Sequence, residues 1–398
     1  MPLTARFLDI HVIHSVPFAN LNRDDTNSVK TVLYGNKVRT RVSSQSWKRA
    51  ARVEFEKVSG NSALRTRRIG EAVARELAGR DWPQALAERA GAHIAASFGK
   101  FEVDVDDEKK VIVNDVVTNA MLYVPRRAVV ELADFAEEHR AELEAAKDIK
   151  KNGNGGDKKA RVSALPKAAV DAILRSRNDV INLFGRMLAE IDRAGVDGAV
   201  QVAHAMTTHE SDVDLDYFTA VDDLTSTWKD GTGSAHMGHA EFSAGTFYRY
   251  ATIDLDELAG NLAGSGSDLR EVLTGFLNAF VLSLPQAKKN STAPHTLPNL
   301  VHFALRGDRP VSYAAAFEEP VRAAAQGGYG TASAKALATY AEAVAGFLGS
   351  SQLLWNGWAS PELKDLPVAL GARTDGLDAL VSEAVAQLPQ VQAEGSAA

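Results

Sequence analysis

The sequence predicts an α+β protein with a ferredoxin-like core, and the order of its strand and helix patterns carries this prediction. Residues 7–16 alternate between apolar and other side chains, which is typical of a half-buried strand. A helix pattern starts near residue 44, with Ser43 or Ser44 as its N-cap. Strand, helix and strand patterns then return at 242–255, 267–284 and 299–307. Two strand–helix–strand halves of this kind form a split βαβ–βαβ arrangement.

A long helical insert separates the two halves. Apolar residues recur at helical spacing across most of residues 60–184. The exception is residues 150–163, which are rich in glycine, asparagine and lysine and predict a flexible exposed loop. The last third of the chain is rich in alanine and predicts further helices.

Composition limits the class of protein. The chain has 398 residues, of which 45% are hydrophobic and 24% charged, so it can bury cores in two or three compact units. It contains no cysteine, which excludes disulfides, thiolate nucleophiles and cysteine-ligated zinc. No stretch approaches ~18 consecutive apolar residues, and polar residues interrupt the N-terminal apolar run, so we expect neither a membrane span nor a signal peptide. These features predict a soluble cytoplasmic protein.

Charge is distributed unevenly along this acidic chain. Its 44 Lys and Arg stand against 51 Asp and Glu, which gives a formal net charge of −7. Residues 1–52 nevertheless hold nine Lys and Arg against three Asp, whereas residues 203–242 hold eight Asp and Glu against one Lys. The two regions suit two partners, one polyanionic and one basic. Two unrelated solvated surfaces are the alternative.

The sequence carries no recognisable catalytic motif. It lacks a G-x-x-x-x-G-K-[ST] phosphate loop, an H-E-x-x-H zinc motif and a G-x-S-x-G nucleophile elbow. Asp212, Asp214 and Asp216 alternate, which fits a hard metal ion but also a partner-facing or solvated strand. Asp24 and Asp25 offer paired carboxylates, although loop capping explains them better. We expect no catalytic residue, no metal and no cofactor.

Residue types that bind phosphate gather where the predicted helix near residue 44 begins. Its free backbone N–H groups, the Ser43 hydroxyl, the Gln45 amide and the cations of Lys48 and Arg52 together suit a phosphate group. Further cations on the preceding segment can extend this site along a nucleic-acid backbone, namely Lys30, Lys37, Arg39 and Arg41. A charged surface without a partner is the alternative.

The same residues carry a resemblance to a known family. Residues 21–52, "LNRDDTNSVKTVLYGNKVRTRVSSQSWKRAAR", resemble the N-terminal signature of the CasC family, the repeated backbone subunit of the type I-E CRISPR Cascade complex. Further matches are "VDGAVQVAHAMTTHESDVDLDYFTAVDDL", "GSAHMGHAEFSAGTFYRYATIDLDEL" and "SYAAAFEEPV". They cover both ends of the chain and its middle, whereas the helical insert matches weakly.

The resemblance implies a hand-shaped fold. It implies an RRM-like, ferredoxin-like palm over residues 1–59 and 241–398, an inserted helical fingers domain over 60–184 and an extended β-hairpin thumb over 185–240. Residues 243–255 match the RNP1 motif only loosely, so base stacking on the sheet face is not implied.

The resemblance also implies a function. In the family, copies of the subunit polymerise along a CRISPR guide RNA and kink it with their thumbs, leaving bases free to pair with a target DNA strand. Other Cascade subunits are further partners, and no membrane is involved. The implied RNA-binding residues are Arg23, Lys30, Lys37, Ser43, Gln45, Lys48, Arg52, Met187, Tyr217, Phe218, Thr219, Lys288 and Lys289. A metal-dependent ribonuclease that cleaves guide-paired RNA through a loop aspartate is the alternative.

Overall fold

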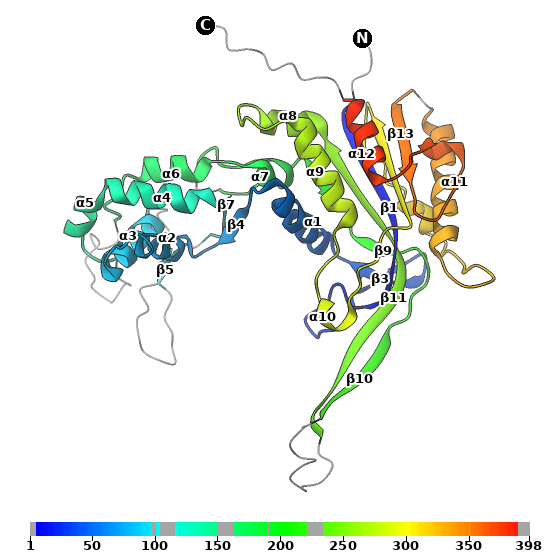
Figure 1. The fold of residues 1–398 in the computed structure, drawn as a ribbon, viewed down its shortest axis with the longest axis horizontal. Coiled ribbons are helices and arrows are strands. Elements are labelled where there is room, and N and C mark those ends of the chain that lie inside the picture. Colours follow the sequence, from blue (N-terminus) through cyan, green and yellow to red (C-terminus); the bar gives the residue numbers. More distant parts are fainter. Residues whose placement is uncertain are drawn as a thin grey trace. The chain divides into compact units, whose positions relative to one another are not determined.

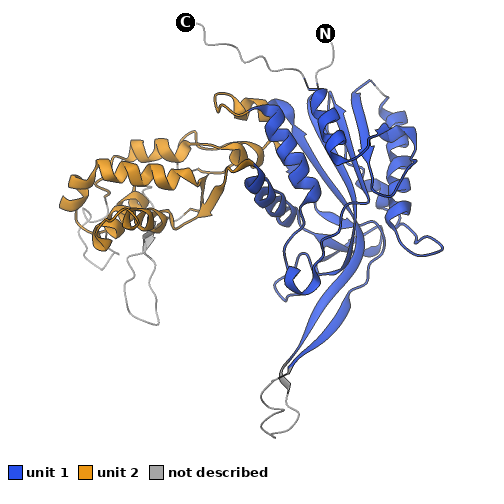
Figure 2. Ribbon diagram, viewed as in Figure 1, with its two compact units in different colours: residues 1–58, 200–256, 268–398 blue, residues 59–199, 257–267 orange. Residues whose placement is uncertain are grey.

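The chain folds into two compact units (Figure 2). Unit 1 comprises residues 1–58, 200–256 and 268–398, and unit 2 comprises residues 59–199 and 257–267. Residues 185–199, predicted from the sequence as part of the thumb, thus belong to unit 2. The computed structural model describes residues 5–97, 101–103, 116–118, 120–149, 162–189, 191–221, 234–349 and 351–388.

Unit 1 is built around one large sheet (Figure 1). Among its described residues the strands follow the order β14-β13-β12-β1-β11-β9-β3-β2, while β8 and β10 each pair with β11. All described pairs in this sheet are antiparallel except β13 with β14. The strands are β1 (Phe7–Ala19), β2 (Thr31–Tyr34), β3 (Lys37–Val42), β8 (Val200–Val202), β9 (Ala205–Thr207), β10 (Asp214–Val221), β11 (Ser234–Asp254), β12 (Leu300–Arg306), β13 (Leu353–Ala359) and β14 (Ala372–Arg373).

Helices cover both faces of this sheet (Figure 1). Helices α1 (Ser44–Ser59) and α9 (Leu269–Leu282) pack on one face, and α11 (Gly330–Leu348) with the 3-10 turn η2 (Ala314–Phe317) packs on the other. The remaining elements of unit 1 are α10 (Lys289–Thr292), η3 (Val368–Leu370) and α12 (Leu377–Ala386), while α8 (Leu255–Leu262) lies mostly in unit 2. Within the part of the chain that the structure describes, no helix combines the length and apolar content that crossing a bilayer requires.

Strand β1 is buried on both faces, so the prediction of a half-buried strand was wrong. Val12 pairs with Arg249 of β11 and shares its face, which α1 and α9 cover. His11 pairs with Tyr250 on the opposite face, and the His11 ring stacks on Tyr313 with ring centroids 4.2 Å apart. The local pattern could not reveal the second cover, because it comes from the C-terminal third of the chain.

A buried polar network explains why charged residues interrupt the apolar run of β1. The Asp9 carboxylate is fully buried and accepts hydrogen bonds from Arg306 Nε (2.8 Å), Tyr250 Oη (2.9 Å) and Val311 N (2.9 Å). Burial raises the pKa of Asp9, and the Arg306 guanidinium opposes that rise. Asp9 and Arg306 are therefore buried as a hydrogen-bonded pair of opposite charge.

Strand β10 and the outer part of β11 form an antiparallel hairpin, here called the β10–β11 hairpin. Its register pairs Asp214 with Phe242, Tyr217 with His239 and Phe218 with Gly238. The hairpin extends away from the rest of the sheet (Figure 1). Residues 222–233, which connect its two strands, lie outside the described residues.

Unit 2 is mainly helical, as the pattern of residues 60–184 predicts. Its helices are α2 (Ile69–Ala78), α3 (Gln84–Ala96), α4 (Arg127–Glu138), α5 (Arg140–Ala145), α6 (Lys167–Arg175) and α7 (Asp179–Phe184). Short strands pair as β4 (Ala63–Thr66) with β7 (Leu122–Pro125) and β5 (Phe101–Val103) with β6 (Val116–Thr118). Helices α2 and α3 touch at Gly70 and Gly91, where a Cβ on either residue would collide with the other's carbonyl oxygen. Most of the predicted 150–163 loop lies outside the described residues.

We expect the free energy of unfolding to fall as the pH is lowered from 7 to 5. Burial lowers the pKa of His14 to about 3 and that of His302 to about 4, below the ordinary value of 6.5. The folded state keeps both rings neutral, whereas the unfolded chain takes up protons below pH ~6.5. The contribution of each histidine to the free energy of unfolding is therefore fully present above the unfolded pKa. It is lost as the pH falls, by ~2 kcal/mol per histidine at pH 5. Urea unfolding at the two pH values measures the loss.

The control compares two histidine variants. His302→Asn should flatten the pH dependence, while His295→Gln, at an exposed position, should leave it as in the parent. Equal pH slopes in parent and His302→Asn protein would contradict the assignment.

Candidate nucleic-acid interface

Helix α1 presents one buried face and two polar faces. Trp47, Ala51 and Phe55 recur at helical spacing and are buried. The Arg249 guanidinium carbon lies 3.9 Å from the centroid of the Trp47 ring and fixes this face against the sheet. At roughly 100° per residue, the two polar faces lie about a third of a turn to either side of the buried one. They are called the cradle face and the groove face below.

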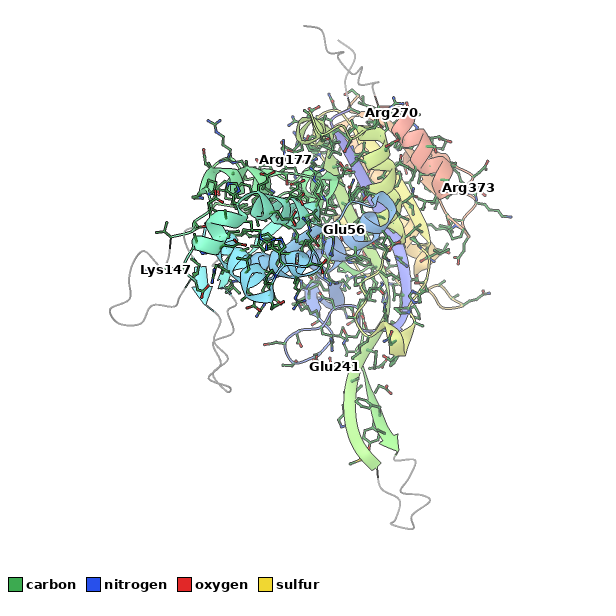
Figure 3. All side chains as sticks on the ribbon, turned by 60° about the vertical axis from the view of Figure 1, so that its left-hand side comes forward. Glu56, Lys147, Arg177, Glu241, Arg270 and Arg373 are labelled. Carbon is green, nitrogen blue, oxygen red and sulfur yellow. The ribbon has the colours of Figure 1, made fainter. Side chains whose placement is uncertain are left out.

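The cradle face consists of Gln45, Lys48 and Arg52, three of the residues that the sequence predicts to bind RNA. Gln45 is exposed, and the other two side chains are partly exposed. Arg52 NH1 forms an ion pair with Glu56 Oε1 at 2.5 Å. Figure 3 labels Glu56, which lies on the last turns of α1. A phosphate that binds Arg52 therefore competes with this carboxylate.

The start of α1 is capped by Ser43. The Ser43 hydroxyl accepts a hydrogen bond from Ser46 N (3.3 Å), and Ser43 N donates to Asn22 Oδ1 (2.9 Å). The side chain is buried, with 8% of the residue exposed. Ser43 thus orients the helix, and its oxygen already has one donor.

Lys30, Arg41 and His204 gather beside the start of α1. His204 Nδ1 accepts hydrogen bonds from Ser44 N (3.0 Å) and Arg41 NH1 (3.2 Å), which leaves Nε2 as the protonated nitrogen of the neutral ring. Burial lowers the pKa of His204, and the charges of Arg41 and Lys30 lower it further. His204 therefore adds a hydrogen-bond donor beside the cations. His204 is not among the residues that the resemblance implies to bind RNA.

The groove face of α1 lines a surface groove of about 960 Å³. The opposite walls come from the loop at residues 21–27 and from residues 282–297. Among the predicted residues, Arg23 and Lys289 line it. Arg49 and Lys57 add positive charge to its lining, which also holds His295 and the carboxylates of Asp24 and Glu54. Its apolar lining includes Leu282 and Leu297.

Two further predicted lysines already have partners. Lys37 Nζ lies 3.0 Å from Glu210 Oε2, in an exposed ion pair. Lys288 Nζ lies 4.7 Å from the centroid of the Phe242 ring, a cation–π contact. Arg49, by contrast, lines the groove although the sequence reasoning did not select it. Arg49 follows Ser46 by three residues, so the two lie on the same side of the helix, and this spacing could have indicated a shared surface.

The loop at residues 20–30 is tied to the base of the hairpin through Glu241, labelled in Figure 3. Glu241 Oε2 accepts a hydrogen bond from Val29 N (2.9 Å), and its carbonyl oxygen accepts one from Asn20 Nδ2 (2.9 Å). Arg23 NH1 donates to Asn27 Oδ1 (3.0 Å) within the loop. Loop conformation and hairpin position are therefore linked.

Asp24 closes a turn within that loop. Its Oδ1 accepts hydrogen bonds from Thr26 N, Thr26 Oγ1 and Ser28 N at 2.8–2.9 Å. These bonds, led by that from the Thr26 hydroxyl, lower the pKa of Asp24. The geometry favours loop capping, the alternative to acid–base chemistry. Among the described residues, no cluster of His, Asp and Glu could hold a metal ion.

The two adjacent hairpin aromatics lie on opposite faces. The Phe218 ring covers Gly238 of its own hairpin, where a Cβ would lie 2.6 Å from the ring. Tyr217 lies on the other face beside His239, with ring centroids 5.3 Å apart, and is 55% exposed. Thr219 shares the face of Tyr217 and pairs with Met237. Met187 is 91% exposed and belongs to unit 2.

The sheet face that bears Tyr248 and Tyr250 does not offer rings for stacking. Both tyrosines are buried, in a core cluster with Leu337 and Ala338 of α11. This agrees with the loose RNP1 match of residues 243–255.

In fold and sequence the chain is similar to subunits of CRISPR RNA-guided surveillance complexes. A solved chain titled "CRISPR RNA-guided surveillance complex, pre-nicking" is 42% identical, with a TM-score of 0.83 over 96% of this chain and 99% of that one. Another, titled "CRISPR RNA-guided surveillance complex", is 38% identical, with a TM-score of 0.75 and the same coverage. A comparison with curated proteins found no match.

The family follows from the sequence match over nearly the whole chain. The model described as "CT1975-like protein" matches residues 8–383, so the chain belongs to this family. The resemblance to the CasC family is thereby confirmed.

Glu241→Gln should loosen the loop at residues 20–30. The neutral amide accepts a weaker hydrogen bond from Val29 N than the carboxylate does, by ~1 kcal/mol. Amide hydrogen exchange at Val29 should therefore accelerate about fivefold. Glu257→Gln, on α8, is the control and should leave Val29 unchanged. Unaltered exchange at Val29 in the Glu241 variant would contradict the link.

Proposed function

We propose that this chain is a non-catalytic CRISPR RNA-binding backbone subunit of a type I-E, Cascade-type surveillance complex in the cytoplasm. Copies polymerise along the guide RNA and present kinked segments of it for pairing with target DNA. The observation that carries the proposal is the cationic start of α1 on an acidic chain of net charge −7. Membership of the family and the similarity to surveillance-complex chains support it.

The core of unit 1 is proposed to be an RRM-like palm. In a ferredoxin-like fold the first strand lies between the third and the fourth, and both helices cover one face. Here β1 lies between β11 and β12, and β8 and β9 pair with the far edge of β11. Helices α1 and α9 both contact Arg249 on one face of β11. These positions support the assignment.

The protein is proposed to read the backbone of the guide, while base pairing reads sequence. Lys48 and Arg52 would neutralise phosphates, and the Gln45 amide would donate to phosphate or sugar oxygens. Such contacts are independent of sequence and depend on salt. Sequence would then be selected only by pairing between guide and DNA.

Tyr217 is the better candidate for the residue that stacks at an RNA kink. Tyr217 is 55% exposed and Phe218 44%, and the Phe218 ring covers Gly238 of its own hairpin. Stacking of a base on an aromatic ring contributes ~1–3 kcal/mol and tolerates any base. A guide-independent subunit needs that tolerance.

The two polar faces of α1 make different predictions for RNA binding. Lys48→Gln with Arg52→Gln should weaken single-stranded RNA of any sequence alike. It should reduce the slope of log K against log salt by ~0.7 for each phosphate that the two cations neutralise in the parent. Arg49→Gln with Lys57→Gln removes the same charge from the groove face and is the matched control. Fluorescence anisotropy over a salt series measures both slopes.

Weakening that is selective for sequence, or equal weakening in both double variants, would count against a cradle on the Lys48 face. Complete absence of RNA from the purified parent complex would overturn the proposed function itself.

Tyr217→Ala should remove the periodic kinks of bound guide RNA, while Phe218→Ala should affect them only through hairpin stability. Nucleotide-resolved chemical probing of the assembled complex shows the kinks as regularly spaced reactive positions. Thermal unfolding of each variant separates a loss of stacking from a loss of folding. A uniform reactivity profile in the parent would leave no kink for either residue to cause.

The non-catalytic assignment predicts that matched RNA and DNA remain intact. Guide-loaded complex incubated with Mg²⁺ or Mn²⁺ should yield no cleavage products on denaturing gels. Cleavage by the parent that Asp24→Asn or Asp214→Asn abolishes would instead favour the ribonuclease.

A further inference from the structure

Three exposed arginines gather on unit 2, from two separate segments of the chain. Arg126 and Arg127 lie where α4 begins, and Arg177 lies in the turn between α6 and α7. Arg127 NH2 donates to the Arg177 carbonyl oxygen (3.2 Å). Ser62 joins the two segments, since its hydroxyl accepts from Arg126 Nε (3.1 Å) and its carbonyl oxygen from Asn178 Nδ2 (3.0 Å). Figure 3 labels Arg177.

This group differs from several other arginines of unit 2 in how its charge is balanced. Arg75 pairs with Glu71, Arg80 with three carboxylates, Arg89 with Asp148 and Arg140 with Glu144. Within the group, Arg127 has Glu131 at 3.4 Å. Among the described residues, no carboxylate lies within ion-pair distance of Arg126 or Arg177. The group therefore carries a net positive charge.

Two features make this concentration of charge unfavourable for the isolated protein. Helix α4 carries arginines at its positive end and the acidic Asp134, Glu137 and Glu138 toward its negative end, the reverse of the favourable arrangement. The buried Arg186 adds a charge close by, and the Arg177 charge contributes to lowering its pKa to about 10, although burial contributes more.

Arg186 is held by carbonyl oxygens alone in the described structure. Its guanidinium donates to the carbonyls of Leu174 (3.0 Å), Arg175 (2.9 Å), Ser176 (2.9 Å) and Ala194 (2.8 Å). These bonds fix the turn that carries Arg177. The exposed arginines thus project from a backbone that is already held in place, so binding does not have to order that turn.

We propose that Arg126, Arg127 and Arg177 form a second polyanion site, on unit 2, which takes the phosphodiester backbone of a nucleic acid. Arginine forks match phosphate oxygens in geometry and charge. The segments 61–68, 122–130 and 173–180 expose no aromatic ring, so the site grips backbone and does not stack on bases. The inference rests on the proposed function only for the identity of the bound nucleic acid, which is guide RNA or duplex DNA around the target.

The test uses the full chain, without guide for the DNA arm and in its guide-loaded assembly for the RNA arm. Arg126→Gln with Arg177→Gln is compared with Arg75→Gln with Arg140→Gln, which removes the same charge from carboxylate-paired arginines of unit 2. One arm measures binding of a short random-sequence DNA duplex by anisotropy over a salt series. The other measures how much guide RNA the assembly retains through a salt gradient. Thermal unfolding checks each variant. If a double variant fails to fold, Arg177→Gln and Arg75→Gln alone replace the patch and control variants.

The patch variant should weaken duplex binding roughly tenfold and lower the salt slope by ~0.9 per phosphate contact, with the control within twofold of the parent. Earlier release of guide RNA with unchanged duplex binding would identify guide RNA as the occupant. Indistinguishable patch and control variants in both arms would overturn the site. Failure of the parent to carry RNA would instead fault the proposed function, because the duplex arm is read independently of it.

Discussion

The contact of Arg249 with Trp47 and Phe280 sets the position of α1, on which the candidate interface of unit 1 depends. The guanidinium is buried in β11, 3.9 Å from the Trp47 ring centroid and 4.9 Å from that of Phe280. It donates to the carbonyl oxygens of Phe280 and Val281 and to His14 Nδ1. Burial lowers its pKa to about 9, so it remains charged at neutral pH. A buried charge with these acceptors ties two helices and two strands into one unit.

The same network reaches the candidate groove. His14 lies on β1, and its Nε2 contacts both the carbonyl and the hydroxyl oxygen of Thr296, at 3.0 and 3.1 Å. Thr296 lines the groove together with the groove face of α1. With Trp47 held against Arg249, the remaining turns of α1 must direct Arg49 into the groove and Lys48 to the other polar face. The one contact at Trp47 fixes the rotation of the helix about its axis, and helix geometry then determines where both cationic faces point.

The acidic net charge of the chain is compatible with several cationic sites because carboxylates neutralise most other arginines of unit 2 locally. Where that neutralisation is missing, as at Arg126 and Arg177, the charge is available to a polyanion. On the hairpin, Gly238 leaves room for the Phe218 ring on one face, while Tyr217 lies beside His239 on the opposite face and is the more exposed of the two aromatics. The charge balance of these arginines and the exposure of these aromatics both depend on the neighbouring residue in space. Neither can be predicted from residue type.

The sequence by itself determined the local elements of this protein. The caps were readable, since Ser43 caps α1 and Asp268 caps α9 through hydrogen bonds to Arg270 N and Glu271 N. So were the buried stripe of α1, the strand at Leu300–Arg306 and the family signature. The caps, the stripe and the strand depend on residues within a few positions of one another, where periodicity and capping act.

Tertiary structure decided which surfaces those elements bury and which they leave open. Strand β1 is covered twice because α11 and η2, far along the chain, pack on its second face. The groove exists because residues 282–297 lie opposite α1, and the three arginines of unit 2 meet because Ser62 bonds both Arg126 and Asn178. A sequence pattern specifies the faces of an element. The partner of each face is set by long-range packing and charge pairing, which residue spacing does not encode.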